Sequence, residues 1–382
     1  MKRLEANTNE NEYYARISKK LRNTKYLALL LTVACAFLTL FAYRDRLTYG
    51  NFRYLFRDID AAGNAAFSSD TVYYTADENN TYAYFREDLA VGSSGGVAFH
   101  RAMGSRSFSD EVNFRSPVLA PSKKYLVAYD SGGYNFYVYN SLGRVYNEKL
   151  DSEIISAAAA DNGHFALLLK NKKGGADIFV YDRNFNRVAS LTRHGDAYTI
   201  GFLEDGRLYI CECKVENASL YTDIVFYTVG EKETHGDMRV SGLAYKLGGS
   251  KNGFYALLDR GISFYGEDGE KNYSFGTADL LFADAKKDSV CVILKENSSG
   301  EECGAYLYND EESVFYAVSK GAKGVALASG RICVLYDGRI TVCYDGETAE
   351  IEIPTGARKI IAVDSDKVIV CYNDYAKIFK VR

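Results

Sequence analysis

The 382-residue sequence lacks the short motifs that mark the commonest catalytic sites. It has no phosphate-binding P-loop and no glycine fingerprint for a dinucleotide at a strand–helix junction. Its one glycine- and serine-rich stretch, Gly92–Gly96, lies inside a predicted hairpin, so we interpret it as a turn and not as the serine elbow of an α/β-hydrolase. We therefore assign no catalytic, cofactor-binding or metal-binding residue, and we expect no cofactor.

The sequence also lacks a concentration of basic residues in its main part. The formal net charge is −4, and residues 1–25 hold seven basic groups against three acidic ones, so this tail is +4 and the remainder is −8. No cluster of Lys and Arg follows Arg57. Because binding to nucleic acid depends on such clusters, we exclude nucleic acid as a partner.

Paired cysteines are also missing from the predicted structure, although the chain has eight cysteines. Cys35 lies in an apolar run near the N-terminus, which leaves an odd number elsewhere. Cys211, Cys291, Cys333 and Cys371 all fall in predicted buried strands. We expect every cysteine to be free and to act as a small apolar side chain.

Histidine is scarce, yet two of the four histidines begin the same tripeptide, His-Gly-Asp. His194-Gly195-Asp196 and His235-Gly236-Asp237 are 41 residues apart, which is one period of the repeat described next. We expect them to occupy equivalent loops on one face of neighbouring repeats. Two His and two Asp in such loops would suit a divalent metal or a polarised substrate. The same residues are also common in ordinary turns.

In contrast, the sequence is rich in strand-forming aromatic residues, with 32 Tyr and 21 Phe, and it repeats a β-hairpin. The clearest copy is Arg331–Asp345, in which Asp337-Gly338 joins two apolar strands and predicts a type I′ turn. A period near 40 residues with several short strands per unit is typical of a β-propeller blade. Successive hairpins begin at Asp88, Lys124, His164, Arg207, Gly253, Ser289, Arg331 and Lys367.

These repeats predict an all-β fold, a β-propeller of eight four-stranded blades preceded by one transmembrane helix, with seven blades as the alternative. The small, apolar stretch Ile155–Ala160 suits an innermost strand. The last repeat has no fourth strand, so a segment near the N-terminus should complete it and remove an exposed edge. The candidates for this closing strand are Phe52–Ile59 and Thr71–Ala76.

An uncharged run of 18 residues, Tyr26–Tyr43, predicts the transmembrane helix. The basic residues before it predict a cytoplasmic N-terminus and a propeller outside the cell membrane. A signal peptidase would have to cut within the apolar run, so we favour an uncleaved signal anchor. We divide the chain into a cytoplasmic basic tail (1–25), the transmembrane helix (26–43), a stalk with a possible closing strand (44–63) and the propeller (64–382).

The hairpin ends, such as Tyr181-Asp182, resemble those of WD40-like and quinoprotein-like propellers. The layout of basic tail, single span and propeller, with stretches such as KYLVAYDSGGYNFYVYN, resembles an uncharacterised family of membrane-anchored propellers from Gram-positive anaerobes. The resemblance covers about residues 64–382 and implies no activity. The absence of Trp departs from WD40 blades, quinoprotein blades and sialidase Asp-boxes, each of which uses this residue.

These observations favour a non-enzymatic, single-pass membrane protein whose propeller is a scaffold or sensor for an unknown protein or glycan at the cell envelope. One alternative is a hydrolase or lyase of an envelope polymer, with its site at the mouth of the propeller channel. The other alternative is a receptor for a small solute.

A binding face is predicted where three connections exceed the two residues that a hairpin needs. These connections are Lys170–Ala176, Lys214–Leu220 and Lys295–Glu302, and we expect them on the same face as both His-Gly-Asp tripeptides. The candidate binding residues are therefore His194, Asp196, His235, Asp237, Lys172, Lys173, Glu216, Asn217 and Glu296.

Overall fold

The computed structural model describes two parts of the chain, and each is considered by itself. They belong to the compact units Met1–Ala62 and Gly63–Arg382. The described residues are 2–42, 71–101, 106–231, 234–250, 253–266, 269–275, 278–286, 289–295, 303–309, 312–363 and 366–381.

The first unit is a single helix, α1 (Lys2–Ala42). No Gly or Pro occurs between Lys2 and Ala42, so nothing in the local sequence breaks the helix. The predicted basic tail and the predicted span are therefore parts of one continuous element. Within α1, Arg16–Leu38 is long and apolar enough to cross a membrane. Its large apolar side chains, such as Leu30 and Phe37, are exposed.

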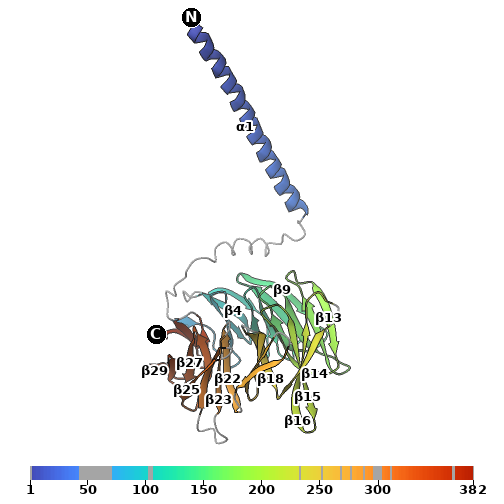
Figure 1. The fold of residues 1–382 in the computed structure, drawn as a ribbon, viewed down its shortest axis with the longest axis vertical. Helices are drawn as coiled ribbons and strands as arrows, with labels where there is room; N and C mark the ends of the chain where they lie inside the picture. The colour runs from blue at the N-terminus through green and yellow to red at the C-terminus, as the bar shows by residue number, and fades with distance from the viewer. Residues whose placement is uncertain are drawn as a thin grey trace. The chain divides into compact units, whose positions relative to one another are not determined.

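The second unit is a propeller of eight antiparallel sheets, each with four strands, as the repeats predict (Figure 1). We call the strands of each blade A to D from the inside outwards, because the A strands of neighbouring blades, such as β10 and β14, contact one another. The A strands are β2 (Thr81–Phe85), β6 (Pro117–Pro121), β10 (Ile154–Ala159), β14 (Asp196–Phe202), β18 (Ala244–Ser250), β22 (Asp279–Lys286), β26 (Gly324–Ala328) and β30 (Lys359–Ala362).

Strands B and C form the hairpins that the sequence repeats. The B strands are β3 (Asp88–Ser93), β7 (Leu126–Asp130), β11 (Phe165–Lys170), β15 (Leu208–Glu216), β19 (Gly253–Leu258), β23 (Ser289–Lys295), β27 (Arg331–Tyr336) and β31 (Lys367–Cys371). The C strands are β4 (Gly96–Arg101), β8 (Asn135–Asn140), β12 (Ala176–Tyr181), β16 (Ser219–Tyr227), β20 (Gly261–Gly266), β24 (Cys303–Asn309), β28 (Arg339–Tyr344) and β32 (Tyr375–Lys380).

The outermost strands complete the blades, which we number 1 to 8 from β2 onwards. The D strands are β5 (Arg106–Glu111), β9 (Gly143–Lys149), β13 (Arg187–Arg193), β17 (His235–Ser241), β21 (Lys271–Phe275), β25 (Glu312–Val318), β29 (Glu347–Glu352) and, for blade 8, β1 (Thr71–Tyr73).

The ring is closed by a strand from before the first blade. β1 pairs antiparallel with β32, with Thr71 opposite Lys377 and Tyr73 opposite Tyr375. This confirms the predicted candidate Thr71–Ala76, and the other candidate, Phe52–Ile59, lies outside the described residues. Blade 8 therefore combines the two ends of the propeller, which removes an open sheet edge.

The core lies between neighbouring blades rather than within one. One cluster joins Leu168 and Ile178 of blade 3 to Ile200 and Ile210 of blade 4. Burying one such side chain contributes roughly 1.5–3 kcal/mol. Each blade therefore depends on its neighbours for most of its stability.

The cysteines are free, as predicted. All those of the propeller are buried except Cys213, which is partly exposed and in this respect departs from the prediction. Four of them, Cys291, Cys303, Cys333 and Cys343, pack together between blades 6 and 7. Burial raises the pKa of Cys333 to about 12, so this thiol stays protonated and unreactive at neutral pH.

The hairpin β27–β28 has the predicted register but a different turn. Cys333 lies opposite Val342, and Ile332 lies opposite Cys343. Gly338 has a φ of 84°, whereas Asp337 is not among the residues with positive φ, so the predicted type I′ turn is wrong. The Asp337 carboxylate instead accepts hydrogen bonds from Lys323 Nζ and Gly356 N, each at 2.9 Å, which fixes its backbone for contacts beyond the hairpin.

Candidate interaction face

The order of strands within a blade defines two faces of the propeller. Because neighbouring strands are antiparallel, the B–C turns and the D-to-A connections between blades lie at the same edge of the sheets. We call this the BC–DA face. The A–B and C–D connections lie at the opposite edge.

The structure separates the two His-Gly-Asp tripeptides. His194 and Gly195 connect β13 to β14, so the first tripeptide is on the BC–DA face, and His194 and Asp196 are exposed. The second begins β17, where His235 is paired with Phe226 near the C–D end of the blade. The prediction of equivalent loops on one face is therefore wrong. Among the described residues, no group of three or more His, Cys, Asp or Glu is placed to hold a metal ion.

The misplacement of the second tripeptide has a physical cause in blade 4. Strands β15 and β16 are nine residues long, whereas β11 and β12 in blade 3 have six. The longer hairpin consumes residues, so the 41-residue step from His194 ends earlier in the next blade, at the start of its D strand. A repeat period predicts equivalent positions only where successive blades have equal strand lengths.

The predicted loop Lys214–Leu220 is in fact the end of this long hairpin. Pairing continues to Glu216 opposite Ser219, and Figure 1 shows β15–β16 extending past the ends of neighbouring strands. Asn217 and Ala218 have φ values of 50° and 61°, which is the type I′ pattern. Glu216 and Asn217 therefore belong to a well-defined projecting hairpin.

The two other predicted loops have different outcomes. Lys172 and Lys173 are exposed in the turn between β11 and β12, on the BC–DA face. The side chain of Asn171 organises this turn by accepting a hydrogen bond from Lys173 N at 2.8 Å. Glu296 lies outside the described residues.

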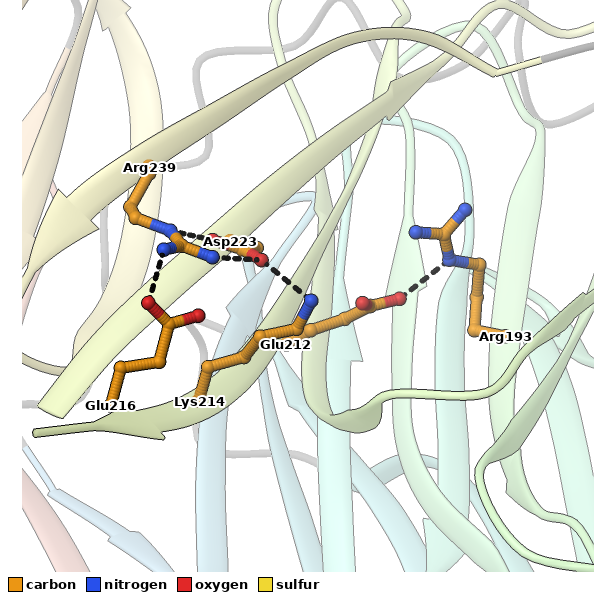
Figure 2. Close-up of polar contacts among 6 residues, drawn as sticks. All are labelled: Arg193, Glu212, Lys214, Glu216, Asp223 and Arg239. Carbon is orange, nitrogen blue, oxygen red and sulfur yellow. Dashed lines mark hydrogen bonds and ion pairs between the residues drawn. The ribbon is translucent and has the colours of Figure 1, made fainter.

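A network of charged side chains supports the projecting hairpin (Figure 2). Arg239 on β17 binds both carboxylate oxygens of Asp223, at 2.7 and 3.1 Å, and donates to Glu216 at 2.9 Å. Lys214 also contacts Asp223, at 2.9 Å. The hydrogen bonds from Arg239 lower the pKa of Asp223 to about 2. Because bidentate pairs fix geometry, this network holds three strands of blade 4 in register.

A second ion pair lies beneath the exposed His194. Glu212 on β15 is buried, and its carboxylate accepts from Arg193 Nε at 2.5 Å. This hydrogen bond raises the pKa of Arg193. Gly195 passes directly over the Glu212 carboxylate, where a Cβ atom would clash with it. The connection that presents His194 is therefore held against a buried charge.

Four consecutive A strands share a β-bulge near their first residue, a feature that the sequence did not reveal. In each strand one residue is skipped in the pairing with strand B. A bulge redirects a side chain that would otherwise alternate with its neighbours. The residues skipped are Ile155 in β10, Tyr198 in β14, Tyr245 in β18 and Leu281 in β22.

These residues, which we call the inner ring, place apolar side chains at the BC–DA ends of the A strands of blades 3 to 6. Tyr245 is 51% exposed and Leu281 is 41% exposed, whereas Ile155 and Tyr198 are half-buried. The Tyr198 hydroxyl donates to the Ala244 carbonyl at 2.6 Å, which ties β14 to β18. The inner ring is thus a partly exposed apolar surface on a fixed scaffold.

Charged groups on other A strands are used to join blades. The Asp284 carboxylate on β22 accepts from Leu327 N on β26 at 2.8 Å, and burial raises its pKa. Lys359 Nζ on β30 donates to the Tyr82 carbonyl on β2 at 2.9 Å, and burial lowers its pKa. Both contacts cross from one blade to the next, so these groups have structural partners.

Comparison with known structures supports the fold. The chain matches a structure titled as the eukaryotic initiation factor with a TM-score of 0.53 at 12% identity, covering 81% of this chain and 87% of that one. The Pan2 WD40 domain of Neurospora crassa matches with a TM-score of 0.48 at 10% identity, over 69% of this chain and 88% of that one. AztD from Citrobacter koseri matches with a TM-score of 0.48 at 11% identity, over 76% and 89%.

At these identities the similarity concerns the fold alone, which is that of a WD40-like propeller. No protein of curated function matches the chain. One family model does match, over residues 64–380, which is nearly the whole propeller and most of the chain. The chain therefore belongs to the family of unknown function DUF5711.

Proposed function

We propose that this protein is a non-enzymatic interaction scaffold, anchored in the cell membrane by α1, whose propeller binds a protein partner at the envelope through its BC–DA face. The observation that carries the proposal is the inner ring, where consecutive bulges hold Tyr245 and Leu281 in solvent. Large apolar side chains on a rigid frame are the usual energetic centre of a protein interface.

The surroundings of the inner ring suit such an interface. Lys172, Lys173, His194 and Asp196 are exposed on the same face, farther from the centre. An apolar centre with a polar surround is the ordinary composition of a protein-binding surface. The projecting β15–β16 hairpin adds a wall whose geometry is set before binding by Asp223 and Arg239.

The alternatives predicted from the sequence need converging reactive or solute-binding groups near the centre of a face. Asp284, an acidic group on an A strand, already accepts backbone hydrogen bonds from Leu327 and Ala285. No observation on the described residues therefore favours a polymer hydrolase, a lyase or a solute receptor over the scaffold.

The membrane part of the proposal rests on α1 and its charges. Arg16–Leu38 can cross a membrane, and the basic residues before Tyr26 favour a cytoplasmic N-terminus. Protease added outside intact cells should then remove the propeller. A propeller that stays intact until the membrane is permeabilised would contradict this orientation.

The binding face is tested by placing a photo-crosslinking amino acid at Tyr245 in the full-length chain and irradiating native membranes. We expect a protease-sensitive adduct, and we expect Leu281→Ser to weaken it because it removes a neighbouring apolar contact. Val188→Ser is the matched control, since Val188 is also an exposed apolar residue but lies on β13 at the outside of blade 3. Absence of an adduct, an adduct to glycan only, or equal loss with both serine variants would refute the proposed protein-binding face.

A further inference from the structure

The outer strand β25 of blade 6 differs from the other D strands in having no protection of its free edge. Its six residues Ser313–Val318 carry no charge, the longest uncharged run in any D strand. All seven residues of β25 pair with β24 without a bulge. Charges and bulges are the usual devices that keep an exposed edge from pairing with another strand.

The remaining D strands each have such a device. The strands β5, β9, β13, β17 and β21 pair with a shift in register near their starts. The strand β29 has no bulge but carries Glu347, Glu350 and Glu352. The closing strand β1 has only three residues. The edge of β25 is thus the long, straight and uncharged one.

The side chains of β25 are as unusual as its edge. Phe315 at its centre is 54% exposed, and its neighbour Val314 is 41% exposed. Phe315 is not a loose side chain, because its ring lies 5.1 Å from that of Tyr306 on β24, which stacks on Tyr308. The strand therefore presents a supported apolar centre together with unpaired backbone groups.

We propose that β25 pairs antiparallel with β25 of a second copy of this chain, forming a symmetric dimer through a continuous eight-stranded sheet. The charges at the two ends of the strand identify this occupant. Glu312 begins β25, and Lys320 lies just beyond its end, and both are exposed. A two-fold axis at Phe315 places Glu312 of each copy near Lys320 of the other, so both ends gain an opposite charge. It also places the apolar centres together.

A cross-link at the axis tests the dimer independently of any association through α1. The full-length chain carries Phe315→Cys, with Cys35→Ser and Cys213→Ser to remove the exposed thiols, and is oxidised in detergent. Residues directly opposite in antiparallel strands have Cα atoms roughly 4.5–5.5 Å apart, within the range of a disulfide. We expect a disulfide-linked dimer. The control is Tyr273→Cys in the same background, because Tyr273 is comparably exposed on the neighbouring D strand β21.

Charge reversal then identifies the partner as an antiparallel copy. In the Phe315→Cys background, Glu312→Lys or Lys320→Glu alone should reduce the yield about fivefold, because each places like charges together at both ends. Mixing the two variants should restore the yield as a mixed dimer, in which both opposite-charge pairs are present again. A yield no higher than that of Tyr273→Cys, insensitivity to charge reversal, or no rescue on mixing would each overturn the proposal. Both charged residues are exposed, so folding is preserved in this arm.

Discussion

Large tyrosines take up central positions between the blades of a propeller that has no tryptophan. Tyr139 and Tyr181 end the C strands of blades 2 and 3, and both are fully buried. Their hydroxyl groups donate to carboxylates, Tyr139 to Asp110 at 2.8 Å and Tyr181 to Glu148 at 2.9 Å. A buried phenol needs such a partner, because an unpaired hydroxyl would lose its hydration without compensation.

The residue after each tyrosine has a separate role in the turn that follows. Asn140 Oδ1 accepts from the backbone N–H groups of Leu142 and Gly143, and Asp182 Oδ1 accepts from those of Asn184 and Asn186. These side chains set the turn into strand D. The Tyr-Asn or Tyr-Asp pair noted in the sequence thus combines a core residue with a turn residue.

The hydroxyl of Tyr139 gives the first prediction. Tyr139→Phe should lower the free energy of unfolding by about 1–2 kcal/mol, because the partly buried Asp110 loses a hydrogen bond while the ring is retained. Urea unfolding of the full chain in detergent measures the effect. Tyr134→Phe is the control, since Tyr134 is exposed and its change should be within about 0.5 kcal/mol. Equal effects at both positions would show that the buried hydroxyl contributes nothing specific.

At the scale of elements, the β15–β16 hairpin is the clearest departure of one blade from the others. It projects from the BC–DA face, ends in a type I′ turn at Asn217-Ala218, and is held to β17 by Arg239. A two-stranded ribbon alone is at best marginally stable in water. The charged network therefore has a structural task at this position that it lacks in blades with shorter hairpins.

The Asp223 carboxylate makes this element sensitive to acid. Its pKa of about 2 lies below the ordinary value of about 3.9 in an unfolded chain, so it stabilises the fold fully above pH 4 and loses this effect as pH falls from about 4 to about 2. Asp223→Asn should cost about 1 kcal/mol at pH 6, and the difference from the parent should shrink below pH 4. Urea unfolding at several pH values measures it.

The control for this prediction is an ion pair of a simpler kind. Glu350 contacts only Arg339 among the printed partners, at 3.4 Å on the exposed surface. Glu350→Gln should change the free energy of unfolding by less than about 0.5 kcal/mol at pH 6. If the cost of Asp223→Asn were the same at pH 6 and pH 2.5, the ion-pair network would not be the cause.

The hairpins were predictable because their signals are local. Alternating apolar residues around Asp337-Gly338 define two strands and their register whatever the rest of the chain does. The inner ring was not predictable, since a bulge at Tyr245 or Leu281 depends on how β18 and β22 curve against neighbouring blades. The lengthened hairpin was missed for a related reason. Polar residues such as Lys214 and Glu216 suggest a loop, and only Arg239 from a third strand makes them part of a sheet.

At the scale of the whole propeller, closure is the property on which every blade depends. Neighbouring blades share their cores, so an open ring would expose a blade face as well as a strand edge. The contacts between the two ends are numerous. The Tyr74 hydroxyl donates to the carbonyls of Tyr372 and Tyr375 at 2.8 and 2.7 Å, and Asn80 Nδ2 donates to the Asn373 carbonyl at 3.1 Å. Sequence reasoning found this closing strand because the last repeat visibly lacked one.

Two neighbouring residues of the closing strand make closure testable within one element. Val72 is 4% exposed and Tyr73 is 72% exposed, so the same substitution meets the core at one position and solvent at the other. Val72→Asp should lower the free energy of unfolding of the full chain by about 3 kcal/mol or more, because a carboxylate is buried where β1 packs on β32. Tyr73→Asp should cost less than about 1 kcal/mol, since β1 keeps its backbone pairing with Ala376 and Tyr375. Urea unfolding monitored by tyrosine fluorescence compares the two. Similar small losses would mean that the propeller is stable without β1 in place, and circular closure would then not govern its stability.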